Sequence, residues 1–186
     1  MENQENLLKK LQAYTPINAL DLENKLQMIQ LLVDYPLDCF HRSCLPAHFT
    51  ASAWILSPAL DQVLLLHHAK LNIWVQPGGH CDAGDCLLSE ALREAQEETG
   101  LLFLKPLMTS IFDIDIHRIP ARGKEPAHKH FDVRFLIQLT QESPLRGNGE
   151  SLSLGWFPLV RDRLPTSESS IIRMLDKTLQ WKTCHL

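Results

Sequence analysis

Three carboxylates and an arginine lie within six consecutive positions of this chain, from Arg93 to Glu98. Glu94, Glu97 and Glu98 stand at i, i+3 and i+4, so they share one face if the segment is helical. Like charges at this spacing repel each other by about 0.2–0.5 kcal/mol per pair, and Arg93 can offset only one of them. A hard divalent cation with oxygen ligands would resolve the repulsion, so the pattern indicates a Mg²⁺ or Mn²⁺ site.

Glycines frame this segment at fixed distances, with Gly79 before it and Gly100 at its end. Between them the chain reads Gly, five residues, Asp85, seven residues, then Arg-Glu-Ala-x-Glu-Glu-x-Gly-Leu. The segment resembles the Nudix box, Gly-x5-Glu-x7-Arg-Glu-U-x-Glu-Glu-x-Gly-U, where U is a bulky apolar residue. It departs at Asp85, where the family has glutamate, and at the small Ala95. A surface helix can carry three glutamates by chance, but the spaced glycines favour the motif.

The resemblance implies an α/β fold, a Nudix-type α/β/α sandwich with a mixed sheet. It also implies hydrolysis of a phosphoanhydride bond in a nucleoside diphosphate linked to another moiety. The transition state of that reaction spreads negative charge over phosphoryl oxygens, which bound divalent metals can neutralise while they orient a water. The implied metal ligands are the Gly79 carbonyl, Glu94, Glu97 and Glu98. Arg93 would hold Glu97 through a charge-assisted hydrogen bond.

The residue that activates water is left open by the resemblance. Some family members use a box glutamate, and others use a carboxylate on a later loop. Glu150, which follows Gly147-Asn148-Gly149, is the candidate of the second kind, with an ordinary solvated turn glutamate as the alternative. Asp85 is one methylene shorter than the family's glutamate, so a contact made there would be lost or bridged by water. The expected catalytic set is Glu98, Glu97, Glu94, Arg93 and Glu150.

A second group of reactive side chains follows the box. Asp113, Asp115 and His117 alternate along one predicted strand, and the next strand carries the alternating set His128, His130, Asp132 and Arg134. A period of two predicts that the intervening apolar residues face the core and that this Asp/His set faces outward. Paired strands would gather the set into one patch for substrate recognition, a further metal or both, the alternative being a solvated sheet face. The expected substrate-binding residues are His80, His117, His128, His130, Asp132 and Arg134.

Helices and strands are expected in an order that suits this fold. A helical segment over 3–34 breaks at Thr15-Pro16, and the apolar stripe of its second half is Leu22, Leu26, Ile29 and Val33. Strands are expected over 51–56, 63–67, 73–76, 107–117, 128–140 and 154–159, and helices over 87–98 and 167–181. Pro77-Gly78-Gly79 is expected to end the third strand, and Ser167 or Thr166 to cap the last helix. The expected domains are an N-terminal helical extension, 1–36, and a Nudix hydrolase domain, 37–186.

Composition limits the class of protein and of partner. The chain has 186 residues, 45% of them hydrophobic and 22% charged, which suits one globular domain. A net charge of −4 argues against a nucleic-acid polymer as partner, and no segment predicts a secretory signal or a membrane span. Five cysteines without a CxxC pair indicate reduced thiols in a cytoplasmic protein. The alternative is a zinc site, suggested by the equal spacing of Cys39 and Cys44 and of Cys81 and Cys86, with His41 and His48 nearby.

Residues 48–181 also resemble a bacterial Nudix subgroup without an assigned substrate. The runs that carry this likeness are Trp74-Val75-Gln76-Pro77-Gly78-Gly79-His80 and the two Asp/His strands. The leading hypothesis is a metal-dependent hydrolase of a small nucleoside diphosphate derivative. Two alternatives stay open: a Nudix module that binds a nucleotide-like ligand without turnover, and an interaction module that acts through the N-terminal helices. Those helices are expected to cover the main domain or to build a homodimer contact.

Overall fold

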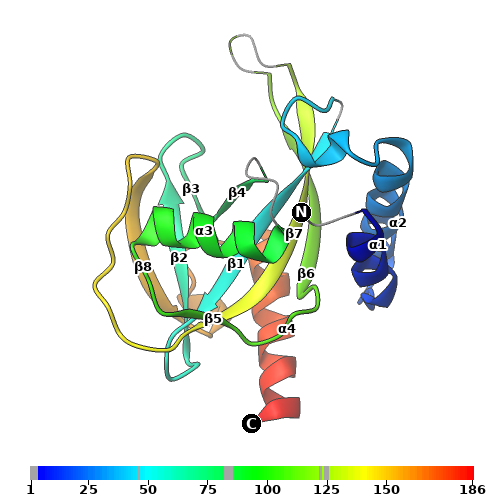
Figure 1. Cartoon of the computed structure of the whole chain (residues 1–186). Helices are drawn as coiled ribbons and strands as arrows, with labels where there is room; N and C mark the ends of the chain where they lie inside the picture. Colours follow the sequence, from blue (N-terminus) through cyan, green and yellow to red (C-terminus); the bar gives the residue numbers. More distant parts are fainter. Residues whose placement is uncertain (1–3, 46, 82–85, 122, 124–125) are drawn as a thin grey trace. The chain divides into compact units, whose positions relative to one another are not determined.

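The computed structural model of the chain describes residues 4–45, 47–81, 86–121, 123 and 126–186 (Figure 1). Backbone contacts group the chain into two compact units. Unit 1 comprises residues 1–52, 78–92 and 108–135, and unit 2 comprises residues 53–77, 93–107 and 136–186. The strand order is β3-β2-β1-β7-β5, with β4 paired to β1, β6 to β7 and β8 to β2.

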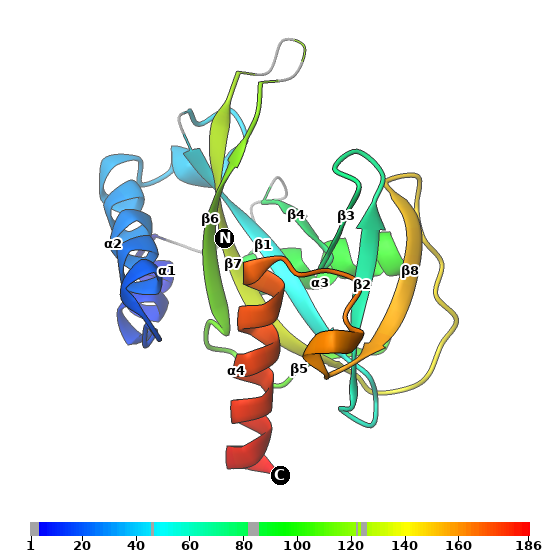
Figure 2. The same cartoon turned by 180° about the vertical axis from the view of Figure 1, so that it is seen from behind.

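Unit 1 begins with α1 (Gln4–Ala13) and α2 (Ala19–Asp34), which lie side by side (Figures 1 and 2). Asn18 caps α2, because its side chain accepts the backbone N–H of Asp21. The Tyr14 hydroxyl donates to the Asp21 carboxylate at 2.8 Å, and the Ile17 N–H donates to it at 3.0 Å. The connection between the two helices therefore ends in a buried carboxylate whose bonds fix the rotation of α2.

This rotation overturns the apolar stripe expected on the second helix. Leu22, Leu26 and Val33 are 47%, 58% and 58% exposed. The side of α2 that is buried instead carries Asp21, Asn24, Met28, Leu31 and Leu32. Periodicity found a coherent apolar stripe, but the polar bonds of Asp21 turn a different face toward the protein.

The strands of unit 1 include β4 (Gly78–His80), where the sequence had indicated the start of a loop. This strand pairs antiparallel with β1 (Ala47–Leu56), Gly78 opposite Ser52 and His80 opposite Thr50. A Cβ on Gly78 would lie 2.8 Å from both the Ala51 carbonyl oxygen and the Ser52 Cα. Only glycine allows this close approach, so the residue read as a turn is what brings β4 onto β1.

The pairing expected for the two Asp/His strands is confirmed in unit 1. β6 (Asp113–Ile119) and β7 (His128–Leu139) are antiparallel, with His117 opposite His130 and Asp113 opposite Arg134. The strand expected over 107–117 begins only at Asp113, as β6. The separate strand β5 (Leu104–Pro106) precedes the expected range and pairs with the far end of β7.

In unit 2, β2 (Gln62–His68) pairs with both β3 (Ile73–Val75) and β8 (Ser151–Pro158). The last helix, α4 (Ser169–His185), lies against the end of β1, since the Trp54 indole N–H donates to Thr178 Oγ1 at 2.8 Å. Its expected cap by Ser167 or Thr166 is wrong: Glu168 stands at the cap without a side-chain bond. Thr166 instead accepts the backbone N–H of Glu168, which is the cap residue itself and not yet part of the helix.

All five cysteines are free thiols, as expected. Burial raises the pKa of Cys39 to about 12, which keeps this thiol neutral. Among the described residues, no cluster able to hold a metal contains a cysteine, so the zinc site considered for the cysteine pairs gains no support. Within the same ranges, no helix has both the length and the apolar character to cross a bilayer.

Candidate active site

The box glutamates lie on α3 (Leu87–Thr99), whose second half, from Arg93 onward, belongs to unit 2. Arg93 donates to Glu94 Oε1 at 2.7 Å and to Glu97 Oε1 at 2.9 Å. One guanidinium therefore bridges two carboxylates, where the spacing had suggested only one. The third carboxylate, Glu98, is buried. The helix face thus presents three carboxylates and one cation, with a surplus of negative charge available to a divalent metal.

Gly100 ends this helix in the left-handed region, with φ of 72°. A Cβ there would be strained by its φ and would also lie 2.8 Å from the Arg146 Cβ. The helix half of the motif therefore has the local structure it requires. Gly79, the proposed carbonyl ligand, lies on β4 in unit 1, and Asp85 falls outside the described residues.

Glu150 stands at an exposed turn just before β8 in unit 2. Its backbone N–H donates to Asn148 Oδ1 at 2.9 Å, and its carboxylate lies 3.9 Å from Lys70 Nζ. More than half of each of these two charged side chains is in solvent, so the ion pair holds Glu150 only weakly. These contacts match the alternative of a solvated turn glutamate as well as they match a catalytic one.

Unit 1 gathers histidines from four strands into one cluster. Ring centroids of neighbouring imidazoles lie 4.9 to 5.4 Å apart. The members come from β1, β4, β6 and β7, and are His48, His80, His117, His128 and His130. Four of these five were expected to bind substrate, so the sequence prediction located most of this group. We call it the histidine cluster.

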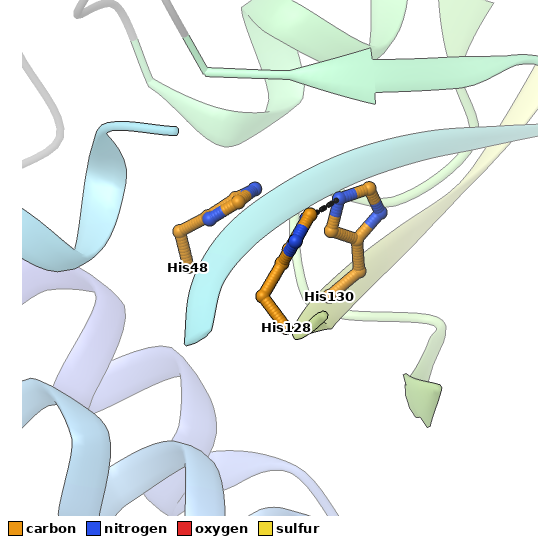
Figure 3. Close-up of side chains that lie close together, drawn as sticks. All are labelled: His48, His128 and His130. Carbon is orange, nitrogen blue, oxygen red and sulfur yellow. Dashed lines mark hydrogen bonds between the residues drawn. The ribbon is translucent and has the colours of Figure 1, made fainter. Parts of the chain in front are cut away.

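His48 is the one member that was not expected to join this group, since the sequence had placed it only near the cysteines of a possible zinc site. It begins a run on β1 in which polar residues alternate with apolar ones, His48, Thr50 and Ser52, and that alternation is the signal that could have found it. Its Nδ1 lies 3.3 Å from the Cys44 carbonyl oxygen, and Figure 3 shows its ring beside His128 and His130.

Two further contacts define the histidine cluster. His128 Nδ1 lies 2.9 Å from the Pro126 carbonyl oxygen, and its Nε2 lies 3.2 Å from His130 Nε2 (Figure 3). Burial is the main cause that lowers the pKa of His130 to about 2, and the surrounding imidazoles of the cluster lower it further. His130 is therefore neutral at physiological pH, with a nitrogen lone pair available for a ligand.

Beside the histidine cluster lies a buried ion network centred on Arg134. Its guanidinium contacts Asp132 at 2.7 Å, Asp113 at 3.1 Å and Asp115 at 3.4 Å. Burial opposes the charge of Arg134, but the three carboxylates and the hydrogen bond that Arg134 donates to Asp132 raise its pKa overall. Three carboxylates thus surround one cation.

This network corrects the expectation that the Asp/His set faces outward. The Arg134, Asp113 and Asp132 side chains are only 3%, 0% and 2% exposed. Asp132 is covered by β1, whose Thr50 and Ser52 hydroxyls donate to its Oδ1 at 3.0 and 2.8 Å. A period of two shows which residues share a face but not whether another strand covers it. Only the fold could show that the part of this face with Asp113, Asp132 and Arg134 is internal, whereas His117 is exposed as expected.

Unit 2 includes a further histidine and two tryptophans, His67, Trp74 and Trp156. His67 stacks on Trp74 with ring centroids 5.1 Å apart, so each of these two side chains packs against the other. Trp156 lines a cavity of about 470 Å³ together with Ser57, Pro58, Gln62, Leu139, Glu142, Ser143 and Pro144. None of the residues expected to act in catalysis, metal binding or substrate binding lines this cavity.

Comparison with known proteins identifies the family to which this arrangement corresponds. A family model described as the NUDIX domain matches residues 46–172. A probable DHNTP pyrophosphohydrolase of Lactococcus lactis is 26% identical over 151 residues, 80% of this chain and 86% of the relative.

Two solved structures extend the comparison. A Caenorhabditis elegans Ap4A hydrolase has a TM-score of 0.57 at 20% identity and covers 73% of this chain and 98% of its own. The NUDIX domain of Shewanella oneidensis NrtR, solved with ADP ribose, has a TM-score of 0.52 at 16% identity and covers 82% and 97%. These likenesses confirm the expected α/β fold with a mixed sheet, flanking helices and an N-terminal helical segment.

Proposed function

We propose a substrate class and a metal requirement for this chain, which belongs to the NUDIX family and is a Nudix-type pyrophosphohydrolase. The proposed reaction cleaves a nucleoside diphosphate linked to another moiety, and it requires a divalent metal. The observation that carries the proposal is the carboxylate face of α3. Its three glutamates stand on one helix face, and Arg93 bonds to two of them. A helix that keeps all three carboxylates retains the groups that a module without turnover would be expected to lose.

The donor set fits Mg²⁺ or Mn²⁺. Carboxylate oxygens are hard ligands, which these ions prefer to nitrogen or sulfur. Glu94, Glu97 and Glu98 would hold the metal, with the Gly79 carbonyl as a further proposed ligand. When bound, the metal would neutralise charge on the phosphoryl oxygens and favour deprotonation of a water.

The side chains of α3 have separate proposed tasks. Arg93 orients the Glu94 and Glu97 carboxylates, because its guanidinium donates to Oε1 of each. Glu98 is the preferred residue to take the proton from the attacking water, since it is buried on the box helix whereas Glu150 is tethered only by a solvated ion pair. Glu150 stays the second candidate for that task.

Substrate contact is proposed for the accessible side of the histidine cluster. His117 is exposed and His130 is half-buried, whereas Asp132 and Arg134 are enclosed. We therefore assign substrate contact to His117, His130 and His80, which directly follows Gly79. His128, Asp132 and Arg134 act as positioning residues.

A substrate panel tests the proposal. Purified protein is assayed with Mg²⁺ or Mn²⁺ against dihydroneopterin triphosphate, Ap4A and ADP-ribose, with products separated by chromatography. These compounds follow the substrates or ligands named for the relatives. We expect at least one to be cleaved only when metal is present.

Variants decide which groups carry the reaction. Glu98→Gln keeps the size of the side chain but removes its charge, and we expect kcat to fall by about 100-fold or more, the lower end of a general-base contribution. Glu23→Gln, on the exposed side of α2, is the matched control and should be unchanged. Tight binding of one compound with no turnover of any would instead identify a sensor module, and full activity in Glu98→Gln would contradict the assigned base.

A further inference from the structure

Three imidazoles of unit 1 converge at the point where β1 approaches β7. One ring nitrogen from each of His48, His128 and His130 lies within 4.8 Å of the other two. Figure 3 shows the three side chains, with the hydrogen bond between His128 and His130 drawn as a dashed line. We propose that these three residues form a binding site for a divalent transition-metal ion of the zinc class, separate from the carboxylate face of α3.

The distances suit such an ion. Zinc binds imidazole nitrogen at about 2.0–2.1 Å, so two nitrogens of a tetrahedral site lie roughly 3.3 Å apart. His128 Nε2 and His130 Nε2 are already 3.2 Å apart. The widest separation in the group is at most 4.8 Å, so the third nitrogen has to move in by about 1.5 Å or less to reach tetrahedral spacing.

The contacts behind the rings have the form that metal-binding histidines require. A ligating histidine usually donates its other ring N–H to a carbonyl or carboxylate, which fixes the tautomer and aims the second nitrogen. His128 Nδ1 faces the Pro126 carbonyl oxygen at 2.9 Å, and His48 Nδ1 faces the Cys44 carbonyl oxygen at 3.3 Å. A carbonyl can only accept, so in both residues the proton is on Nδ1 and the lone pair is on Nε2. In the metal-free cluster His130 Nε2 then donates to His128 Nε2, and for metal binding this proton has to move to His130 Nδ1.

The charge next to the cluster also favours a cation. In the β6–β7 register the His117–His130 pair stands beside the Asp115–Asp132 pair. Asp115 Oδ2 lies 3.2 Å from His117 Nδ1, and the adjoining network sets three carboxylates against the single guanidinium of Arg134. When these carboxylates are ionised, a layer with surplus negative charge borders the imidazoles, and a divalent cation among the histidines would offset it.

The donor set distinguishes this site from the box. Neutral imidazole suits zinc, copper, iron and nickel, whereas magnesium prefers oxygen. Three protein ligands leave one tetrahedral position for a water or for His80, whose ring centroid is 4.9 Å from that of His130. Because His48 belongs to β1 and the other two to β7, a bound ion would tie the two strands together.

Zinc is the probe that tests the site. Full-length protein is stripped with a chelator and dialysed, and Zn²⁺ is titrated against a chromophoric competitor in excess Mg²⁺, which occupies the oxygen ligands of α3. We expect one tightly bound Zn²⁺ per chain and a higher Tm on binding. Co²⁺ in its place should give the visible absorption of a tetrahedral nitrogen site.

Substitutions locate the bound ion. His128→Gln and His130→Gln should each weaken zinc binding by about 100-fold or more. Removing a residue that only hydrogen-bonds to a metal ligand can already cost about 100-fold, and these variants remove a ligand itself. His41→Gln, an exposed histidine outside the cluster, and Glu98→Gln should leave it unchanged. Circular dichroism confirms that each variant is folded, and the half-buried His130 tolerates substitution best.

Three results would overturn the proposal. Folded wild-type protein could bind no stoichiometric zinc. Zinc could bind equally well in both histidine variants. The binding could also be lost in Glu98→Gln, which would assign the ion to the box. These readouts measure binding directly, so they are independent of whether the proposed hydrolysis is found.

Discussion

Replacing Arg134 with methionine tests whether the buried ion network supports unit 1. The change removes the guanidinium but keeps a long apolar side chain, so it leaves little cavity. Asp113 and Asp132, whose side chains are 0% and 2% exposed, then lose their shared cation. Burying a charge without its partner is the costly event, because the low-dielectric interior does not solvate it.

The expected loss is large relative to the stability of a domain. Removing one partner of a buried ion pair costs about 3–5 kcal/mol. Both buried pairs share one guanidinium, so their costs do not add, and we expect a loss of about 4 kcal/mol. The free energy of unfolding of a single domain is about 5–15 kcal/mol. If the wild-type value exceeds about 5 kcal/mol, the variant is destabilised but still folded at room temperature.

The measurement is urea unfolding followed by circular dichroism, with Arg161→Met as the control. Arg161 and Asp176 also form an ion pair, at 2.9 Å, but both side chains are more than half exposed. An exposed pair contributes about 0–1 kcal/mol, so this control should change little.

The pH dependence of the difference provides an independent check. Without the guanidinium, burial favours the neutral, protonated form of the two carboxyls over the charged form. The folded variant then binds more protons than its unfolded state, so its deficit is largest at pH 7 and shrinks as the pH falls toward 4. A loss below about 1 kcal/mol at pH 7, or equal losses for both arginine variants, would refute the reasoning.

Three further predictions concern α4, His130 and α2. Thr178→Val leaves the buried Trp54 indole N–H without its 2.8 Å acceptor, so the free energy of unfolding should fall by about 1–3 kcal/mol. The same urea assay measures this loss, with Thr183→Val on the exposed side of α4 as the control. In metal-free protein the folded pKa of His130, about 2, lies below its unfolded value near 6.5. Stability should therefore fall as the pH drops below about 6.5, by at most about 1.4 kcal/mol per unit, and His130→Gln should reduce that slope; an unchanged slope in a folded variant would contradict the burial argument. If the exposed α2 face builds the expected homodimer, light scattering should show a dimer that Leu26→Asp converts to a monomer, whereas a monomeric wild type would exclude it.

The chemistry of the box could be read from the chain because its residues are local. Arg93 and Glu97 are four positions apart, and one helix is enough to bring them within 2.9 Å. The β6–β7 pairing was equally accessible, since two alternating strands joined by a short connection leave few other registers. The domain boundary at residues 36 and 37 and the roles of the site residues stay predictions.

Other features depended on contacts between distant parts of the chain. Asp132 lies 80 and 82 positions from Ser52 and Thr50, whose hydroxyls bind it. No spacing rule links such residues, so neither the burial of the Asp/His face nor the place of His48 in the cluster was foreseen. In α2, the bonds of Asp21 outweighed the apolar periodicity and left Leu26 in solvent.

The sequence by itself thus determined the family, the carboxylate face of α3 and the strand pair that carries most of the histidine cluster. These follow from helical and strand periodicity, which act over a few residues. Only the tertiary structure decided which faces are covered, that Arg134 is the cation of a buried network, and that His48 meets His128 and His130. These features arise where β1 approaches β7. Burial there affects both the charge of the side chains and their affinity for a metal, and it depends on both strands together.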